Sequence, residues 1–409
     1  MSGSRPVLRG AAAMWAVAAE LGAIYVLSNL PTPLYVIYRQ AFGFSQLTLT
    51  VIYAVYVVGT IATMFFLGRL SDQIGRRPVV LASLVLAGLS GIAFLLAAST
   101  PWLIVARILS GFAIALASGA STAWILELHP RQDKAGATQI ALAANSLGLA
   151  VGPLIAGFLA DVAPAPLRLP YVAFLPLVLA AAALIWASQE TIEEPTPLKD
   201  TSLRPRLGVP REIRSSFVTP ATAAFATFAV LGFYSALIPS LLGQALHISS
   251  HAVAGGIVAG LFLVSTAAIV AAPRVEPRTG MIAGLLLLVP AIALLVIAEA
   301  CHSMTLLLAG TAVGGLASGL GYRFGLQRVN ELAPEEQRSE VISSYLIVCY
   351  AAISLPVVGV GVLSGATNPM VADAVFGGLI AALAIAALVF ELRPSRRKAA
   401  QRRGASTLT

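Results

Sequence analysis

Long apolar segments separated by short polar ones run along the whole chain. Each apolar segment approaches the ~20 residues that a helix needs to cross a bilayer, and the short alternating segments of a membrane β-barrel are absent. The pattern predicts an all-α, polytopic membrane protein with twelve transmembrane helices. The predicted spans are residues 11–38, 46–67, 78–98, 101–125, 135–160, 168–188, 217–242, 251–272, 279–299, 303–328, 338–364 and 370–392.

A long polar connection divides the predicted spans into two groups of six. It covers residues 189–216 and is rich in proline and charge, so we expect a cytoplasmic linker there. The tetrapeptide Leu-Ala-Ser-Gly at 116–119 recurs at 316–319, which favours two pseudo-symmetric six-helix bundles. Such repeats place a substrate site between the halves, near the middle of the membrane. The predicted parts are an N-terminal bundle (1–188), the linker (189–216), a C-terminal bundle (217–392) and a basic tail (393–409).

Positive charges gather in alternate polar segments. The chain is 58% hydrophobic and only 11% charged, yet it has a net charge of +8. With the N-terminus in the cytoplasm, 22 of the 26 lysines and arginines fall in cytoplasmic segments, as the positive-inside rule requires. We therefore expect a multi-pass protein of the cell inner membrane with both termini in the cytoplasm. The basic excess then reflects topology and contact with the lipid bilayer, and no nucleic-acid partner is expected.

The loop between the second and third predicted spans holds glycines and charges in a specific order. It contains Gly68, Asp72, Gly75, Arg76 and Arg77. This run resembles the signature G-x-L-a-D-r-x-G-r-k of the major facilitator superfamily, which lies at the same place in that family. The resemblance extends over the twelve spans and the central linker. It implies a transporter whose two helical bundles expose a central site alternately to the two sides of the membrane.

In that family, the loop aspartate is thought to latch the two bundles together when the protein is open to the outside. The chain offers Arg76 as a partner for Asp72, and Glu127 near the end of the fourth span as a second partner for Arg76. Arg338, at the start of the eleventh span, is the expected partner across the halves. The alternative is that the loop arginines only anchor the topology at lipid phosphates.

Two charged residues stand inside predicted spans. Glu20 lies deep in the first span, where loss of hydration favours a neutral carboxyl group, so we expect it to take up and release a coupling proton. Arg107, in Leu103-x-x-x-Arg107-x-x-Ser110-Gly111, resembles the arginine of the family pattern l-x-x-x-R-x-x-q-G, and we expect it to take part in proton coupling together with Glu20. An arginine in a span usually faces a cavity or a partner. The alternatives are that Glu20 attracts a cationic substrate or stays protonated, and that Arg107 extends to the membrane surface.

The fifth predicted span carries a glycine-proline pattern at Gly148, Gly152, Pro153 and Gly157. It resembles the antiporter signature G-x-x-x-G-P-x-x-G-G of the same family, with Ala156 in place of one glycine. Small residues at this spacing allow close helix packing, and the eighth span is the expected neighbour. The resemblance favours export by exchange over uptake.

The expected function is proton-coupled efflux of a small molecule or drug by alternating access. Proton-coupled uptake of a sugar or organic acid is one alternative, and a transport-inactive membrane sensor is another. Neither a phosphate-binding loop nor a metal-ligand cluster nor a nucleophile constellation appears, so we expect no enzyme, no metal and no cofactor, with a proton gradient as the energy source. We also expect a monomer. Polar residues expected to line the substrate cavity are Tyr25, Asn29, Asn145 and Tyr234.

Overall fold

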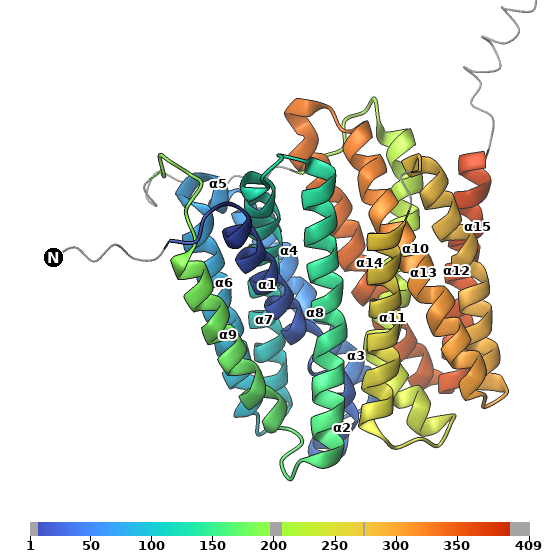
Figure 1. The fold of residues 1–409 in the computed structure, drawn as a ribbon. Coiled ribbons are helices and arrows are strands. Elements are labelled where there is room, and N and C mark those ends of the chain that lie inside the picture. Colours follow the sequence, from blue (N-terminus) through green and yellow to red (C-terminus); the bar gives the residue numbers. More distant parts are fainter. Residues whose placement is uncertain (1–6, 197–206, 273–274, 393–409) are drawn as a thin grey trace, which may run out of the picture.

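The computed structural model describes residues 7–196, 207–272 and 275–392, and in these ranges the regular structure is helical. The basic tail and part of the predicted linker lie outside the described residues. Figure 1 shows the helices side by side in two bundles. The first half comprises α1 (Gly10–Asn29), η1 (Thr32–Leu34), α2 (Tyr35–Phe42), α3 (Gln46–Ala54), α4 (Tyr56–Leu67), α5 (Leu70–Ile74), α6 (Arg76–Leu95), α7 (Thr100–Leu128), α8 (Lys134–Val162) and α9 (Leu169–Ala187). The second comprises α10 (Arg214–Gln244), α11 (His251–Ala271), α12 (Pro277–Ala300), α13 (Met304–Leu332), η3 (Glu335–Gln337), α14 (Arg338–Ala366) and α15 (Pro369–Leu392).

The predicted twelve-span architecture is confirmed. Within the described residues, twelve helical segments are long and apolar enough to cross a membrane, and their bounds lie within a few residues of the predicted spans. The first span is interrupted near Pro31 and Pro33, because proline lacks the amide hydrogen that a helix needs. The second span is interrupted at Val55, between α3 and α4. Each interruption leaves backbone carbonyl groups without intrahelical partners.

The two ends of the molecule differ in how closely the halves approach. We call them the α5 end (top in Figure 1) and the α2 end (bottom in Figure 1). At the α2 end, α8 of the first half packs along α11 of the second, and α3 packs along α14. Toward the α5 end, a chamber separates the halves and is lined by α4, α7 and α8 on one side and by α13 and α14 on the other.

Helix α8 is in backbone contact with helices on both sides. A Cβ atom added at Gly148 would lie 2.2 Å from the Gly22 carbonyl oxygen in α1, so only glycine fits there. On the other side, a Cβ atom at Gly157 would lie 2.3 Å from the His251 carbonyl oxygen in α11. The fifth span therefore packs against the eighth, as the glycine pattern predicted, and it packs equally closely against the first.

We predict that the α8–α11 contact is sensitive to a single methyl group. A Cβ atom at Gly255 would lie 2.1 Å from the Pro153 carbonyl oxygen, whereas one at Gly256 meets nothing within 4 Å. The Gly255→Ala variant should lose about 1–3 kcal/mol of stability because the two helices must separate. The Gly256→Ala variant is the matched control and should be unchanged or slightly more stable, since alanine favours helix. Thermal unfolding in detergent checks this, and equal midpoints for the two variants would contradict it.

Candidate functional site

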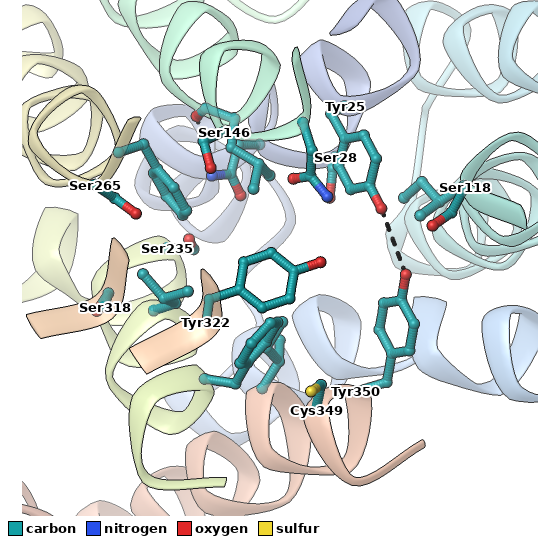
Figure 2. Close-up of a pocket in the computed structure, with 18 of the residues that line it drawn as sticks. Tyr25, Ser28, Ser118, Ser146, Ser235, Ser265, Ser318, Tyr322, Cys349 and Tyr350 are labelled. Atoms are coloured by element: carbon teal, nitrogen blue, oxygen red, sulfur yellow. Dashed lines mark hydrogen bonds between the residues drawn. The ribbon is translucent and has the colours of Figure 1, made fainter. Parts of the chain in front are cut away.

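A cavity lies between the two halves, about midway along the helices. Its deep part is small, about 60 Å³, and is walled by aromatic rings and neutral polar groups. Figure 2 shows Tyr25 of α1 and Tyr350 of α14 directed toward one another, and their hydroxyl oxygens are 3.5 Å apart. This contact joins the halves across the cavity. Polar residues of the wall include Ser28, Asn29, Ser118, Asn145, Ser146, Ser235, Ser265, Ser318 and Cys349.

A wider chamber adjoins the deep part on the side of the α5 end. Tyr25, Ser118, Asn145, Tyr322 and Tyr350 line both, so the two spaces adjoin one another at these residues. The chamber measures about 370 Å³, which is within the range of pockets that hold drug-sized ligands. Its rim carries side chains from α5, α6 and α14. The cavity is therefore reached from the α5 end, while close packing of the halves covers it toward the α2 end.

The structure brings three of the four predicted cavity residues to this wall. Tyr25, Asn29 and Asn145 line it, and the Asn29 side-chain amide also donates to the Leu149 carbonyl, 3.2 Å away. Tyr234 is not among the lining residues. It is buried on the face of α10 that packs against α13, where its hydroxyl accepts a hydrogen bond from Thr311. The prediction did not separate these positions because a sequence does not show which side of a helix faces inward.

Glu20 is fully buried in the first half. Its carboxylate accepts hydrogen bonds from Ser121 of α7 (2.7 Å) and from Ser83 of α6 (3.4 Å). It does not line the cavity, but the adjacent residue, Leu21, lines the chamber. Glu20 thus lies directly behind the chamber wall, bound to two neighbouring helices by hydroxyl groups that can either donate or accept a proton.

Arg107 is also fully buried, and it holds together the two interrupted spans. Its guanidinium group donates to the carbonyl oxygens of Ser28, in the last turn of α1, and Tyr53, in the last turn of α3, both at 2.9 Å. The same group lies 4.4 Å from the ring centroid of Tyr56. A cation is favoured at a helix C-terminus, where carbonyl oxygens are unpaired. Glu20 and Arg107 therefore bind different partners.

The charged loop at the α5 end forms the cluster that the sequence predicted within the first half. Arg76 pairs with Asp72 at 2.5 Å and with Glu127 at 2.6 Å, and it also donates to the Ser71 hydroxyl. The arginine side chain is 8% exposed, whereas that of Asp72 is 51% exposed. No ion pair joins Asp72 to Arg338 in the described part of the chain. The within-half contacts are thus present in this conformation without the contact across the halves.

At the α2 end, a carboxylate of the first half binds the start of a helix in the second. Asp161 of α8 accepts hydrogen bonds from the backbone amides of His251 and Ala252 and from the Ser250 hydroxyl, at 2.6–2.9 Å. The His251 ring lies 2.8 Å from the same carboxylate. An acidic group is favoured at a helix N-terminus, where amide groups are unpaired. Asp161 is therefore a direct tie between the halves at the closed end.

These features match one family of membrane proteins. A family model described as Major Facilitator Superfamily matches residues 17–275, more than half of the chain. The chain belongs to the Major Facilitator Superfamily. As in other members of this superfamily, two helical bundles enclose a central cavity, which agrees with the fold described above.

Individual relatives of this superfamily member match over parts of their length. The inner membrane transport protein YnfM of Escherichia coli (strain K12) is 27% identical over 189 residues, covering 45% of this chain and 43% of that protein. Multidrug resistance protein 2 of Bacillus subtilis (strain 168) is 27% identical over 124 residues, 30% of each chain. Tetracycline resistance protein, class B, of Escherichia coli is 33% identical over 120 residues, 28% of each chain. The matched segments span less than half the length of these relatives.

A solved structure shares the fold over nearly the whole chain. It is a bacterial homologue of the human lysosomal transporter Spinster in an inward-facing and unoccupied conformation. The two structures superpose with a TM-score of 0.66 over 93% of this chain and 94% of that chain, at 15% sequence identity. At this identity the likeness establishes the fold alone, which is that of a Major Facilitator Superfamily transporter.

Two acidic residues of the site were not singled out from the sequence. One is Asp161, and the other is Glu190, which follows α9. The Glu190 carboxylate accepts hydrogen bonds from the backbone amides of Arg76 (3.0 Å) and Arg77 (2.9 Å) at the start of α6. Gly75 has φ +108°, and a Cβ atom there would lie 2.7 Å from the Glu190 carboxylate. Glycine is therefore required at this position both by its backbone conformation and by the approach of the carboxylate.

We predict that Glu190 stabilises the start of α6. The Glu190→Ala variant leaves the amides of Arg76 and Arg77 without their charged acceptor, which should cost about 1.5–3 kcal/mol of local stability. Hydrogen exchange at these two amides should then be at least about tenfold faster. Exposed Glu193 lies in the same segment, so Glu193→Ala is the matched control and should leave the exchange unchanged. Unchanged protection in Glu190→Ala would contradict the assignment.

Proposed function

We propose that this Major Facilitator Superfamily transporter exports a small amphipathic molecule in exchange for protons by alternating access. The observation that carries the proposal is the chamber between the halves, which is reached from one end only and has a buried carboxyl group directly behind its wall. A transporter of this kind needs a site that is exposed to one side at a time and a titratable group that senses the gradient.

The arginine and lysine distribution supports a cytoplasmic α5 end in an inner membrane. The polar segments that reach this end carry most of the positive charge, including Arg76 and Arg77. In this orientation, the structure corresponds to a conformation that is open to the cytoplasm. Substrate would enter the chamber from the cytoplasm and leave after the α2 end has opened. The proposal requires no cofactor other than the proton gradient, and a single chain contains the complete chamber.

The cavity wall supports an uncharged or weakly charged aromatic substrate. Aromatic rings offer stacking surfaces, and neutral hydroxyl and amide groups offer hydrogen bonds without a fixed charge. Two arginines that would suit an organic acid are already engaged. Arg107 donates to the Ser28 and Tyr53 carbonyls, and Arg323 donates to those of Ile269 and Ala272. The names of two relatives, a multidrug and a tetracycline resistance protein, agree with export of drug-like compounds.

Glu20 is the proposed proton-coupling residue. An ionised carboxylate at this depth can accept hydrogen bonds from both Ser83 and Ser121, whereas a protonated one must donate one of its own. Protonation therefore changes how α1 is held against α6 and α7. Arg107 has the proposed role of keeping α1 and α3 in register during this change, rather than pairing with the proton site.

The charged clusters at the two ends are the proposed gates. Asp161 holds the α2 end closed in the present conformation. In the outward-open conformation, that tie would break, the α5 end would close, and the exposed Asp72 would meet Arg338. Arg76 and Glu127 would remain paired in both states, because both belong to the first half.

We predict that Glu20→Gln abolishes transport driven by a pH gradient while the protein still binds substrate. Glutamine keeps the shape and hydrogen bonding of the neutral acid but cannot release a proton. The measurement uses proteoliposomes with an imposed pH gradient and a panel of toxic amphipathic compounds, with exposed Glu193→Gln as the control.

Proton release coupled to substrate entry indicates exchange, and co-entry of protons and substrate would indicate symport instead. A fully coupled Glu20→Gln protein would refute the role of Glu20, and absence of flux in the parent protein would favour the sensor.

We also predict that Asp161→Ala shifts the protein toward the outward-open conformation. Cys349 lines the cavity and is buried, so it can report opening of the α2 end. In a Cys301→Ser background, a membrane-impermeant thiol reagent added outside should label Cys349 several-fold faster in Asp161→Ala. The control is Glu336→Ala at an exposed position of the other end. Equal labelling rates in the two variants would show that Asp161 does not hold this end closed.

A further inference from the structure

A second cavity at the α2 end lies apart from the substrate chamber and contains two buried carboxyl groups. Glu299, near the end of α12, is 6% exposed, and Asp373, in α15, is 8% exposed. Both line the same cavity, which is formed by α10, α12, α14 and α15 together with the start of α3. None of the residues discussed above for proton coupling or substrate binding lines it. Its side chains therefore need a separate explanation.

The two carboxyl groups lack the partners that burial normally requires. Among the described residues, neither forms an ion pair with a basic side chain, and neither accepts a hydrogen bond. A negative charge on Glu299 makes a negative charge on Asp373 less favourable, so the two groups repel one another when both are ionised. Glu299 also lies in the last turn of α12, where the helix dipole disfavours negative charge. Burying charge in this way is costly unless an opposite charge compensates it.

Two basic groups near this cavity donate hydrogen bonds to neutral partners. His302 attracts Glu299 when protonated, and its Nδ1 atom donates to the Ala245 carbonyl oxygen, 2.6 Å away. Arg39 donates to the side-chain oxygen of Gln46, a residue of α3 that lines the cavity. Among the described residues, neither forms an ion pair with Glu299 or Asp373.

An independent observation indicates that the cavity receives a ligand. Ser240 of α10 is 7% exposed and lines the same cavity, and its hydroxyl oxygen has no hydrogen-bond partner. A buried hydroxyl group without a partner costs free energy unless something outside the chain satisfies it. Ser364 adds a further oxygen to the lining, and exposed Gln244 places part of the lining at the protein surface.

We propose that this cavity, lined by Glu299, Asp373 and Ser240, binds one hard cation through oxygen ligands, either Na⁺ or Ca²⁺. Carboxylate and hydroxyl oxygens are the ligands that such ions prefer. The space is about 30 Å³, which accommodates a bare ion or one to two waters but not an organic substrate. Mg²⁺ fits poorly because it usually keeps several of its own waters.

The site links cation binding to the conformation of the α2 end. Four of its five helices belong to the second half, whereas Gln46 comes from the first half and lines the cavity in this conformation, with the α2 end closed. The bound cation therefore stabilises the closed α2 end. This goes beyond proton exchange at Glu20, since a second ion would bias the same conformational equilibrium from the opposite end of the molecule.

The test uses the purified full-length protein in detergent, without a gradient or substrate, so it does not depend on the proposed transport function. The thermal midpoint is measured in sodium, calcium and magnesium chloride against choline chloride at constant ionic strength and neutral pH. We expect sodium or calcium to raise the midpoint in a saturable way, and magnesium to have at least tenfold weaker effect. The cation that acts identifies the occupant. No shift with either cation, or an equal shift with magnesium, overturns the proposal.

Variants locate the site. Asp373→Asn and Glu299→Gln should each weaken the cation response at least tenfold, whereas Glu336→Gln, at an exposed position, should retain it. In choline chloride, the two cavity variants should be at least as stable as the parent protein, because one of two repelling charges is gone; this verifies that they fold.

Cys301 is exposed and lies two residues after Glu299, so its rate of labelling by a thiol reagent reports on the cavity. Cation binding should slow this labelling. A cation response that survives in both cavity variants overturns the proposal.

Discussion

The double hydrogen bond from Arg107 to the carbonyl oxygens of Ser28 and Tyr53 is the interaction on which the central cavity depends. Backbone groups inside a bilayer must find partners within the protein, and both of the first two spans are interrupted where they have to bend. One guanidinium group donates a hydrogen bond to a carbonyl oxygen at each interruption. Its positive charge is also favoured at the two helix C-termini. The contact joins the end of α1, which carries the cavity residues Ser28 and Asn29, to the end of α3.

At two helix N-termini, carboxylates accept hydrogen bonds from backbone amides that have no partner within the helix. Glu190 binds the amides that begin α6, and Asp161 binds those that begin α11. The first contact lies within one half and can persist through a transport cycle. The second joins the halves and would break if the α2 end opened in the proposed transport cycle. The same chemistry thus connects segments within one half in one place and joins the two halves in another.

Sequence reasoning predicted the features that depend on local pattern. Span length and hydrophobicity fixed the twelve helices, and the pairing of Arg76 with Asp72 and Glu127 followed from a loop of known type. Sequence reasoning did not predict that Tyr234 points away from the cavity. Which face of α10 points into the cavity depends on how α10 packs against α13. Sequence reasoning also passed over Asp161, whose partner amides are remote in sequence. The expected pair of Asp72 and Arg338 is absent from the described residues in this conformation, and a sequence does not specify which conformation a structure shows.

The position of α8 explains how a change at a buried carboxyl group can reach the opposite end of the molecule. Glu20 lies on α1, and two residues later the Gly22 carbonyl is in contact with Gly148 of α8. Farther along, Gly157 touches the start of α11, next to the Asp161 tie. These contacts involve backbone atoms without flexible side chains between them, so a shift of α1 cannot be absorbed locally. In the proposed mechanism, a movement of α1 on protonation of Glu20 would therefore be transmitted through α8 to the contact that closes the α2 end.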